Sequence, residues 1–222
     1  GAGPLNGGRR GPDKAVFGST AGIVAPTGYI DYGVGGGFVA DNVDALGGQQ
    51  SGGACAIKAF LSSSGEDFPG VNNGLVRRAM QRAAQLGMLL GFHCEDYFIT
   101  EDGQARLQAL GRNTRQDFLD SRPVVAELLS TKAMIDLCEQ TGARVHICHV
   151  THPKVAEEIR RAKARGANLT AEPCPHYLLF TGQDMVRAGP LLKCAPPLRD
   201  EAAREGLWRY LLDGTLDCVV SD

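Results

Sequence analysis

The stretch VHICHVTHPKVAEEIRRAKARGANLTAE, residues 145–172, contains a strand, a helix and a second strand in immediate succession. Residues 145–150 form a short apolar run, which predicts a buried strand. The helical pattern of residues 153–165 begins with proline in its first turn and ends at Gly166. Residues 169–172 predict the next strand. Strands joined by a helix in this way favour a right-handed β/α/β unit and a parallel sheet.

The same alternation continues on both sides of this stretch. Short apolar runs are separated by helical patterns, and Gly87 and Gly142 end two of the predicted helices. At least five such units follow residue 54, and they predict an α/β fold. The further strands are predicted at residues 54–60, 88–93 and 216–221, and the further helices at residues 72–86, 123–141 and 200–212.

Polar residues at the ends of several predicted strands favour a (β/α)8 barrel over an open doubly wound sheet. In a barrel the carboxyl ends of the strands converge on one mouth, whereas a dinucleotide-binding sheet needs a glycine fingerprint between its first strand and helix. Residues 33–37 (GVGGG) match that fingerprint poorly, because no helical pattern clearly follows them. The residues at the strand ends are Lys58, His93, His149, Glu172 and Asp222.

Composition limits the partners of the protein. The 222 residues carry 23 Lys and Arg against 25 Asp and Glu, a net charge of −2, which argues against nucleic acid or an anionic membrane as a partner. No apolar run is long enough to span a bilayer, and no signal peptide is visible. The seven cysteines are dispersed without a CxxC pair, which predicts free thiols in a reducing cytoplasm.

Glycine is concentrated at the front of the chain, where 16 of the 29 glycines lie within residues 1–53. We therefore expect one incomplete catalytic barrel domain over residues 1–222. Its front part, residues 1–53, is rich in glycine and poorly defined, and residues 54–222 form the regular β/α units. The glycines at 35–37 are either turns or an edge of the fold that lacks its neighbours.

The chemistry centres on Lys58, which lies inside the apolar run AIKAF. Burying an ammonium without a partner is costly, so this lysine must be paired, neutral or modified. A neutral amine reacts with carbon dioxide to form a carbamate, an anion that is able to bridge two metal ions. With the imidazoles of His93 and His149 and the carboxylate of Asp222, it would make the ligand set of a two-metal hydrolase.

Several segments resemble the cyclic amidohydrolases, and most closely their allantoinase branch. A tyrosine that is typical of dihydropyrimidinases and hydantoinases is replaced here by Ser63, and the dihydroorotases that are otherwise most similar often lack the lysine at position 58. The resemblance covers roughly residues 29–222. The matching segments are KAFLS (58–62), GFHCE (91–95), HICHVT (146–151), EPCPHYL (172–178), KCAPPLRD (193–200) and VVSD (219–222).

The resemblance implies a metal-dependent hydrolysis that opens the hydantoin ring of allantoin to give allantoate. It implies two divalent metal ions, with zinc expected and cobalt, iron or manganese as alternatives, bridged by carboxylated Lys58. His93, His149 and Asp222 are the further ligands, and Asp222 also carries the proton from a bridging hydroxide to the leaving nitrogen. Substrate contacts are expected from Ser63 and from the backbone of Cys194 and Ala195. Supporting roles, but no ligand positions, are expected for His146, His152, His176 and Glu172.

The resemblance is incomplete at both ends. The family's first barrel strand carries a His-x-His pair, but the five histidines here all lie at position 93 or later, and the sequence stops at Asp222. We therefore expect a partial barrel that lacks the first strand and a C-terminal segment, with at most weak activity on its own. The resemblance also suggests a homo-oligomer, often a tetramer.

Three other functions remain open from the sequence alone. The first is a dihydropyrimidinase or hydantoinase and the second is a dihydroorotase, which would act on different cyclic amides. The third is a non-catalytic relative that keeps the barrel for assembly. Such relatives typically lose the metal ligands, so the joint presence of Lys58, His93, His149 and Asp222 speaks against it.

Overall fold

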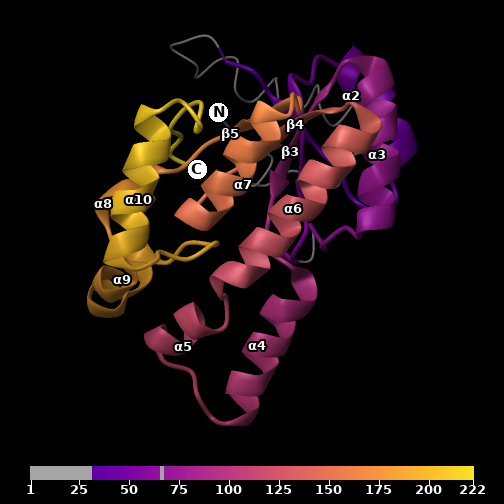
Figure 1. Cartoon of the computed structure of the whole chain (residues 1–222). Helices are drawn as coiled ribbons and strands as arrows, with labels where there is room; N and C mark the ends of the chain where they lie inside the picture. The colour runs from indigo at the N-terminus through magenta and orange to yellow at the C-terminus, as the bar shows by residue number, and fades with distance from the viewer. Residues whose placement is uncertain (1–31, 66–67) are drawn as a thin grey trace.

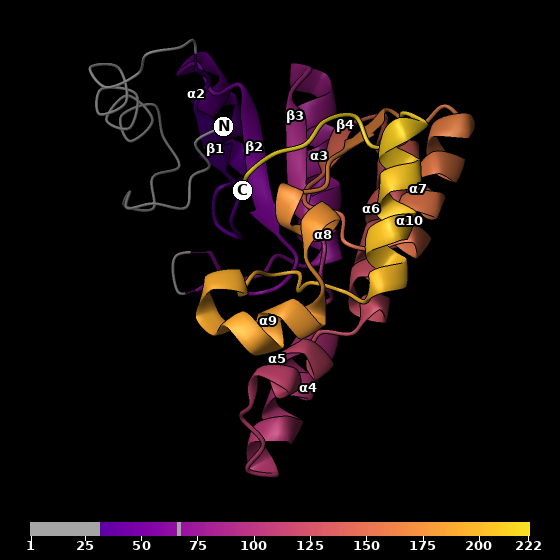
Figure 2. The same ribbon diagram turned by 90° about the vertical axis from the view of Figure 1, so that its left-hand side faces the viewer.

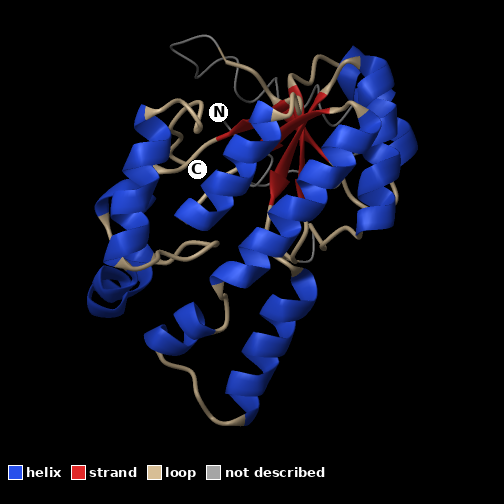
Figure 3. Cartoon of the chain, in the orientation of Figure 1, coloured by secondary structure: helices blue, strands red, loops and turns tan. Residues whose placement is uncertain are grey.

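The computed structural model describes residues 32–65 and 68–222. Their centre is a five-stranded sheet in which every neighbouring pair is parallel and the strands follow each other in chain order (Figures 1 and 3). A doubly wound sheet reverses its strand order at a switch point, whereas a barrel adds each strand on the same side. The sheet therefore has the topology of part of a barrel. The strands are β1 (Gly35–Gly37), β2 (Ala56–Phe60), β3 (Leu89–His93), β4 (Arg144–Ile147) and β5 (Leu169–Ala171).

Helices between consecutive strands cover one face of the sheet, as Figures 1 and 2 show. Two of these helices, α4 (Tyr97–Ala109) and α5 (Arg115–Asp120) between β3 and β4, project instead as an arm below the sheet, and the remaining helices follow β5. The longer helices are α3 (Asn73–Leu86), α4 (Tyr97–Ala109), α6 (Val124–Thr141), α7 (Pro153–Ala164) and α10 (Glu201–Leu212). The shorter ones are η1 (Val43–Ala45), α2 (Leu46–Ser51), α5 (Arg115–Asp120), α8 (Pro175–Leu179), α9 (Gly182–Ala188) and η2 (Gly189–Leu192).

Local signals explain where the helices begin and end. The side chain of Asn72 accepts a hydrogen bond from the backbone N–H of Leu75 and caps α3, which ends at Gly87 in the left-handed conformation. Gly142 ends α6 in the same way. Asp200 caps α10. The predicted helices are thus confirmed to within one or two residues. No helix in residues 32–65 and 68–222 is long and apolar enough to cross a membrane.

Successive side chains along the strands point alternately into the hydrophobic core and to the opposite face of the sheet. Ile57, Leu90, Val145 and Ile147 are fully buried and belong to the hydrophobic core cluster that packs against the helices. The residues between them point to the opposite face, because successive side chains of a strand alternate. The pairing register aligns four of them in one row across that face, namely Lys58, Gly91, His146 and Thr170.

The glycines at 35–37 form a strand rather than a turn. This strand, β1, pairs with β2 at the edge of the described sheet. The side-chain amide of Gln49 accepts from the N–H of Gly37 at 3.1 Å and donates to its carbonyl at 3.0 Å. A Cβ at Gly36 would lie 2.0 Å from Oε1 of Gln49, so this approach requires glycine there. Later in the predicted front part, residues 43–51 form η1 and α2, whereas residues 1–31 lie outside the described residues.

The strand predicted at residues 216–221 does not form, which corrects that prediction. The segment lies beside β5, with backbone hydrogen bonds from Asp217 to Ala171 and from Val220 to Pro173. The carboxylate of Asp217 accepts the N–H of Ala171 at 2.7 Å and pairs with Lys163 at 2.6 Å. A side chain thus takes the place that a backbone carbonyl would fill in a ladder, and regular pairing stops.

Candidate functional site

The parallel register brings the predicted site residues to one end of the sheet. Lys58 lies in the middle of β2, His93 is the last residue of β3, and His149 follows β4 by two residues. Phe60 of β2 is paired with His93, so Lys58 lies one layer below the histidine on the same face. Carboxyl ends of parallel strands meet at one edge, which is where active sites lie in β/α barrels.

His93 and His149 face each other at this edge. Nδ1 of His93 lies 3.2 Å from Nε2 of His149, and both side chains are buried. Two nitrogens that share one tetrahedral ion at 2.0–2.1 Å are separated by about 3.3 Å. The spacing of this pair therefore fits a common divalent metal ion as well as it fits a direct hydrogen bond.

The backbone and environment of His149 support a ligand role. Its φ of 44° lies in the left-handed region, which is uncommon for a residue other than glycine. Its Nδ1 is buried without a hydrogen-bond partner among the described residues. Burial, followed by the positive charges of Lys58 and His93, lowers the pKa of His149 well below its usual range. The imidazole is therefore neutral at pH 7 and keeps a lone pair for a metal.

One cavity of about 160 Å³ joins most of the predicted site residues. The structure brings Lys58, His93, His149, Asp222, Ser63 and Ala195 to its wall. Cys194 is the exception, because it does not line the cavity and it packs against the hydrophobic core cluster. The remaining lining residues are Phe60, Ser62, Ser64 and Arg122.

Lys58 is less buried than its apolar surroundings in sequence suggest, since its side chain is only half-buried. Its ammonium lies 5.4 Å from the centre of the Phe60 ring, a favourable cation–π contact. Within residues 32–65 and 68–222 no carboxylate forms an ion pair with it. Carboxylation of this lysine stays a prediction.

Glu95 and Arg122 belong to the site but were not predicted as site residues. Oε2 of Glu95 accepts from Nε2 of His93 at 2.8 Å and from Nη1 of Arg122 at 2.5 Å. The carboxylate therefore holds the ring of His93 so that Nδ1 points at His149, an arrangement typical of metal-binding histidines. A buried acid two residues after a histidine is a readable signal for Glu95, but no local pattern points to Arg122.

The other histidines have supporting contacts. His152 caps α7 by accepting the N–H of Lys154 at 3.0 Å, and burial lowers its pKa to about 4. His146 lies 3.0 Å from Glu172 on the inner face of the sheet. His176 lies on α8, and its Nε2 has no partner among the described residues. None of the three lines the cavity.

No family model matches the chain, and the sequence comparison gives relatives that are named as allantoinases. An allantoinase of Deinococcus radiodurans is 38% identical over 211 residues, covering 95% of this chain and 46% of that protein. An allantoinase of Escherichia coli K12 is 34% identical over 192 residues, covering 84% of this chain and 42% of that protein. The chain spans about half the length of the curated relatives it matches.

Solved structures agree on the fold. An L-hydantoinase (dihydropyrimidinase) from Arthrobacter aurescens matches with a TM-score of 0.91 and 27% identity, over 95% of this chain and 47% of that one. A D-hydantoinase from Thermus sp. matches with a TM-score of 0.89 at 24% identity, over 98% of this chain and 48% of that one, which supports the fold alone. Together with the sequential parallel sheet, these likenesses confirm the predicted partial (β/α)8 barrel.

Proposed function

The chain is homologous to bacterial allantoinases over about half of their length, and from this premise we propose that it serves metal-dependent hydrolysis of a cyclic amide. The reaction is the opening of the hydantoin ring of allantoin to allantoate. The observation that carries the proposal is the pair His93 and His149, 3.2 Å apart in a cavity that Lys58 and Asp222 also line.

The donor atoms suit divalent metal ions. His93 and His149 would hold one ion, while Asp222 and a carboxylated Lys58 would complete the set and connect it to a second ion. Zinc is the expected metal, with cobalt, iron or manganese as alternatives. Ions bound here would make water a better nucleophile at neutral pH and would polarise the amide carbonyl.

The residues of the chain supply the remaining steps. The carboxylate of Asp222 takes the proton of the attacking water and passes it to the ring nitrogen as the C–N bond breaks. Glu95 holds His93 in place. The side chain of Ser63 and the backbone of Cys194 and Ala195 would contact the substrate. In this assignment the thiol of Cys194 stays in the core and only its backbone serves the site.

Hydrolysis of hydantoins or dihydropyrimidines is the second candidate. It is favoured by the structural likeness to the L-hydantoinase, with a TM-score of 0.91. The sequence likeness to allantoinases is higher, at 34–38% identity against 27%, so allantoin is the first choice.

The seven cysteines form no disulfide in the structure, which supports the cytoplasm as the location.

A comparison of four substrates tests the proposal. The chain is loaded with zinc or cobalt, and ring opening is followed for allantoin, hydantoin, dihydrouracil and dihydroorotate. Because the chain contains no His-x-His pair, we expect slow turnover, with allantoin the fastest of the four. Asp222→Asn should lower this rate by about 10²-fold or more, since it removes the acid–base group.

Asp136→Asn is the matched control, because Asp136 is exposed on α6, away from the cavity. It should leave the rate unchanged. Equal rates for the wild type and Asp222→Asn would overturn the assigned role of Asp222. A faster reaction with dihydrouracil than with allantoin would replace the first candidate by the second.

A further inference from the structure

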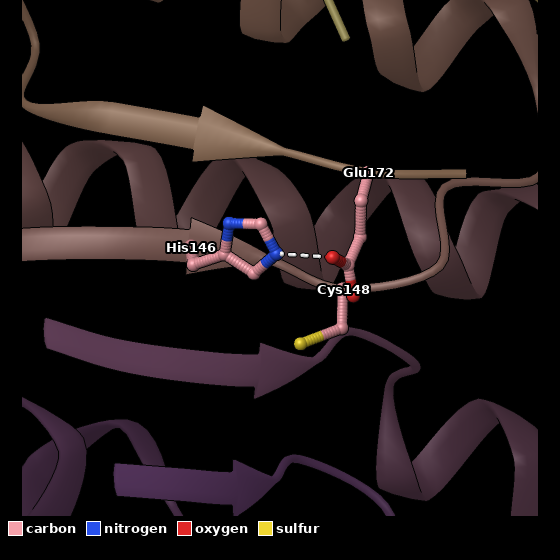
Figure 4. Close-up of side chains that lie close together, drawn as sticks. All are labelled: His146, Cys148 and Glu172. Atoms are coloured by element: carbon pink, nitrogen blue, oxygen red, sulfur yellow. Dashed lines mark ion pairs between the residues drawn. The ribbon is translucent and has the colours of Figure 1, made fainter. Parts of the chain in front are cut away.

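A second group of potential metal ligands lies on the inner face of the sheet, outside the cavity. His146 belongs to β4, Cys148 follows β4 directly, and Glu172 follows β5 (Figure 4). One ligand atom from each residue, a ring nitrogen, a thiol sulfur and a carboxylate oxygen, lies within 4.8 Å of the other two. None of the three lines the cavity.

The contacts of His146 leave a place for a cation. Nδ1 of His146 lies 2.7 Å from the hydroxyl of Thr170, and Nε2 lies 3.0 Å from Oε2 of Glu172. If Nδ1 donates its hydrogen to Thr170, a neutral ring turns the lone pair of Nε2 toward a carboxylate oxygen. Two acceptors at this distance need a positive charge between them, which is either a proton or a metal ion.

The position of Cys148 is also specific. The residue is buried, and its sulfur lies on the side of β3, where Gly91 presents no side chain (Figure 4). A Cβ at Gly91 would lie 3.4 Å from this sulfur, at the short limit of ordinary van der Waals contact. The glycine therefore makes room for the thiol beside the pair of His146 and Glu172.

We propose that His146, Cys148 and Glu172 bind one divalent cation of the zinc type through Nε2, Sγ and a carboxylate oxygen. A neutral imidazole, a thiolate and a carboxylate carry two negative charges in all, which balance the charge of the ion. Mixed nitrogen, sulfur and oxygen donors are typical of tetrahedral zinc, with water in the fourth position. The ion would tie the ends of β4 and β5 together, a role that ring opening does not require.

Cobalt titration of the metal-free chain tests this site. Co²⁺ bound to a thiolate gives charge-transfer absorption in the near ultraviolet, and no cysteine lines the cavity, so this band reports on a thiolate outside the cavity. Besides Cys148, the thiol of Cys218 lies near the proposed site, 3.5 Å from Oε2 of Glu172. We expect the band to reach the amplitude of one thiolate-bound cobalt ion per chain. Cys148→Ser should abolish it, whereas Cys218→Ser, which changes the exposed thiol beside Glu172, should leave it intact.

Glu172→Gln keeps the thiol and serves as a second variant should Cys148→Ser fail to fold. It should weaken the affinity measured from the thiolate band by about tenfold or more, since it removes a charged ligand. The proposal is overturned if the wild-type chain shows no thiolate band, or if the band persists unchanged in Cys148→Ser or Glu172→Gln. Ring-opening rates play no part in this readout, so its result is independent of the proposed hydrolysis.

Discussion

Glu95 and Glu127 are both buried, and each contacts an arginine, yet their surroundings differ. Glu127 lies in the first turn of α6 and binds the loop after β4, where Oε1 accepts the N–H of Thr151 at 2.8 Å. Its Oε2 accepts from Arg199 at 3.1 Å and from the hydroxyl of Thr151. Both oxygens are used. Glu95 uses only Oε2, for His93 and Arg122, and its Oε1 has no partner in the described part of the chain.

The pKa values of the two carboxyl groups shift in opposite directions. Burial raises the pKa of Glu127, and the charge of Arg199 and the bonds from Thr151 offset this only in part. Burial acts on Glu95 in the same sense, but the hydrogen bond and charge of His93, with the charge of Arg122, outweigh it and lower the pKa. Glu127 is therefore a carboxylate that stabilises the fold, whereas Glu95 orients a candidate metal ligand.

The largest expected effect is the loss of stability when the ion pair between Arg199 and Glu127 is removed. Arg199→Ala leaves Glu127 buried without its cation, so we expect the free energy of unfolding to fall by about 3–5 kcal/mol. Urea unfolding followed by circular dichroism measures this loss. As a control, Arg187→Ala removes an exposed arginine from a surface pair with Asp184 and should change the stability little. Similar losses in the two variants would contradict the role given to Glu127.

The next largest effect is the loss of metal affinity when the hydrogen bond between Glu95 and His93 is weakened. Glu95→Gln weakens the bond that fixes His93, and we expect the affinity of the cavity for Co²⁺ to fall by about 10–100-fold. The measurement is made in a Cys148→Ser background, so that binding at the cavity is observed alone. Glu101→Gln, on the exposed side of α4, is the matched control. An unchanged affinity in Glu95→Gln would show that the carboxylate does not act through His93.

The smallest expected effect concerns the pH dependence of the free energy of unfolding, to which Glu127 and Glu95 contribute with opposite signs. The raised pKa of Glu127 gives stability that is present below its ordinary value of 4.5 and lost as the pH rises through the folded value. The lowered pKa of Glu95 gives stability that is present above 4.5 and lost as the pH falls through the folded value. Each slope is at most about 1.4 kcal/mol per pH unit.

Unfolding free energies of the wild type, Glu127→Gln and Glu95→Gln over a pH series check this prediction. The difference between the wild type and Glu127→Gln should shrink as the pH rises above 4.5. The difference for Glu95→Gln should shrink as the pH falls below 4.5. Differences that move in the same direction would contradict the contrast between the two carboxyl groups.

Local signals were enough to predict much of the fold. The caps of α3 and the glycines after α3 and α6 set the helix ends, and the apolar runs placed β2 to β5. Two features were decided by side chains distant in sequence. The side chain of Gln49 forms hydrogen bonds that hold residues 35–37 in a strand. The carboxylate of Asp217 accepts a backbone hydrogen bond from Ala171, and regular strand pairing does not form at residues 216–221. Neither contact can be read from hydrophobic periodicity.

The candidate site was predicted in part for the same reason. His93 and His149 stand at the carboxyl ends of their strands and Lys58 in the middle of β2, on the same face, so the parallel sheet brings the three together once the strands are placed. The contact between Glu95 and Arg122 joins residues 27 positions apart, with α4 and α5 between them, and only the fold reveals it. Carboxylation of Lys58, the identity of the metal and a tetrameric assembly stay predictions.

The central claim is that His93 and His149 bind a shared divalent metal ion. Anomalous diffraction at the zinc edge, from crystals of the chain grown with zinc, tests it most directly. We expect a peak within bonding distance of both Nδ1 of His93 and Nε2 of His149, at about 2.0–2.1 Å from each. Zinc peaks elsewhere with none between these two nitrogens would contradict the claim.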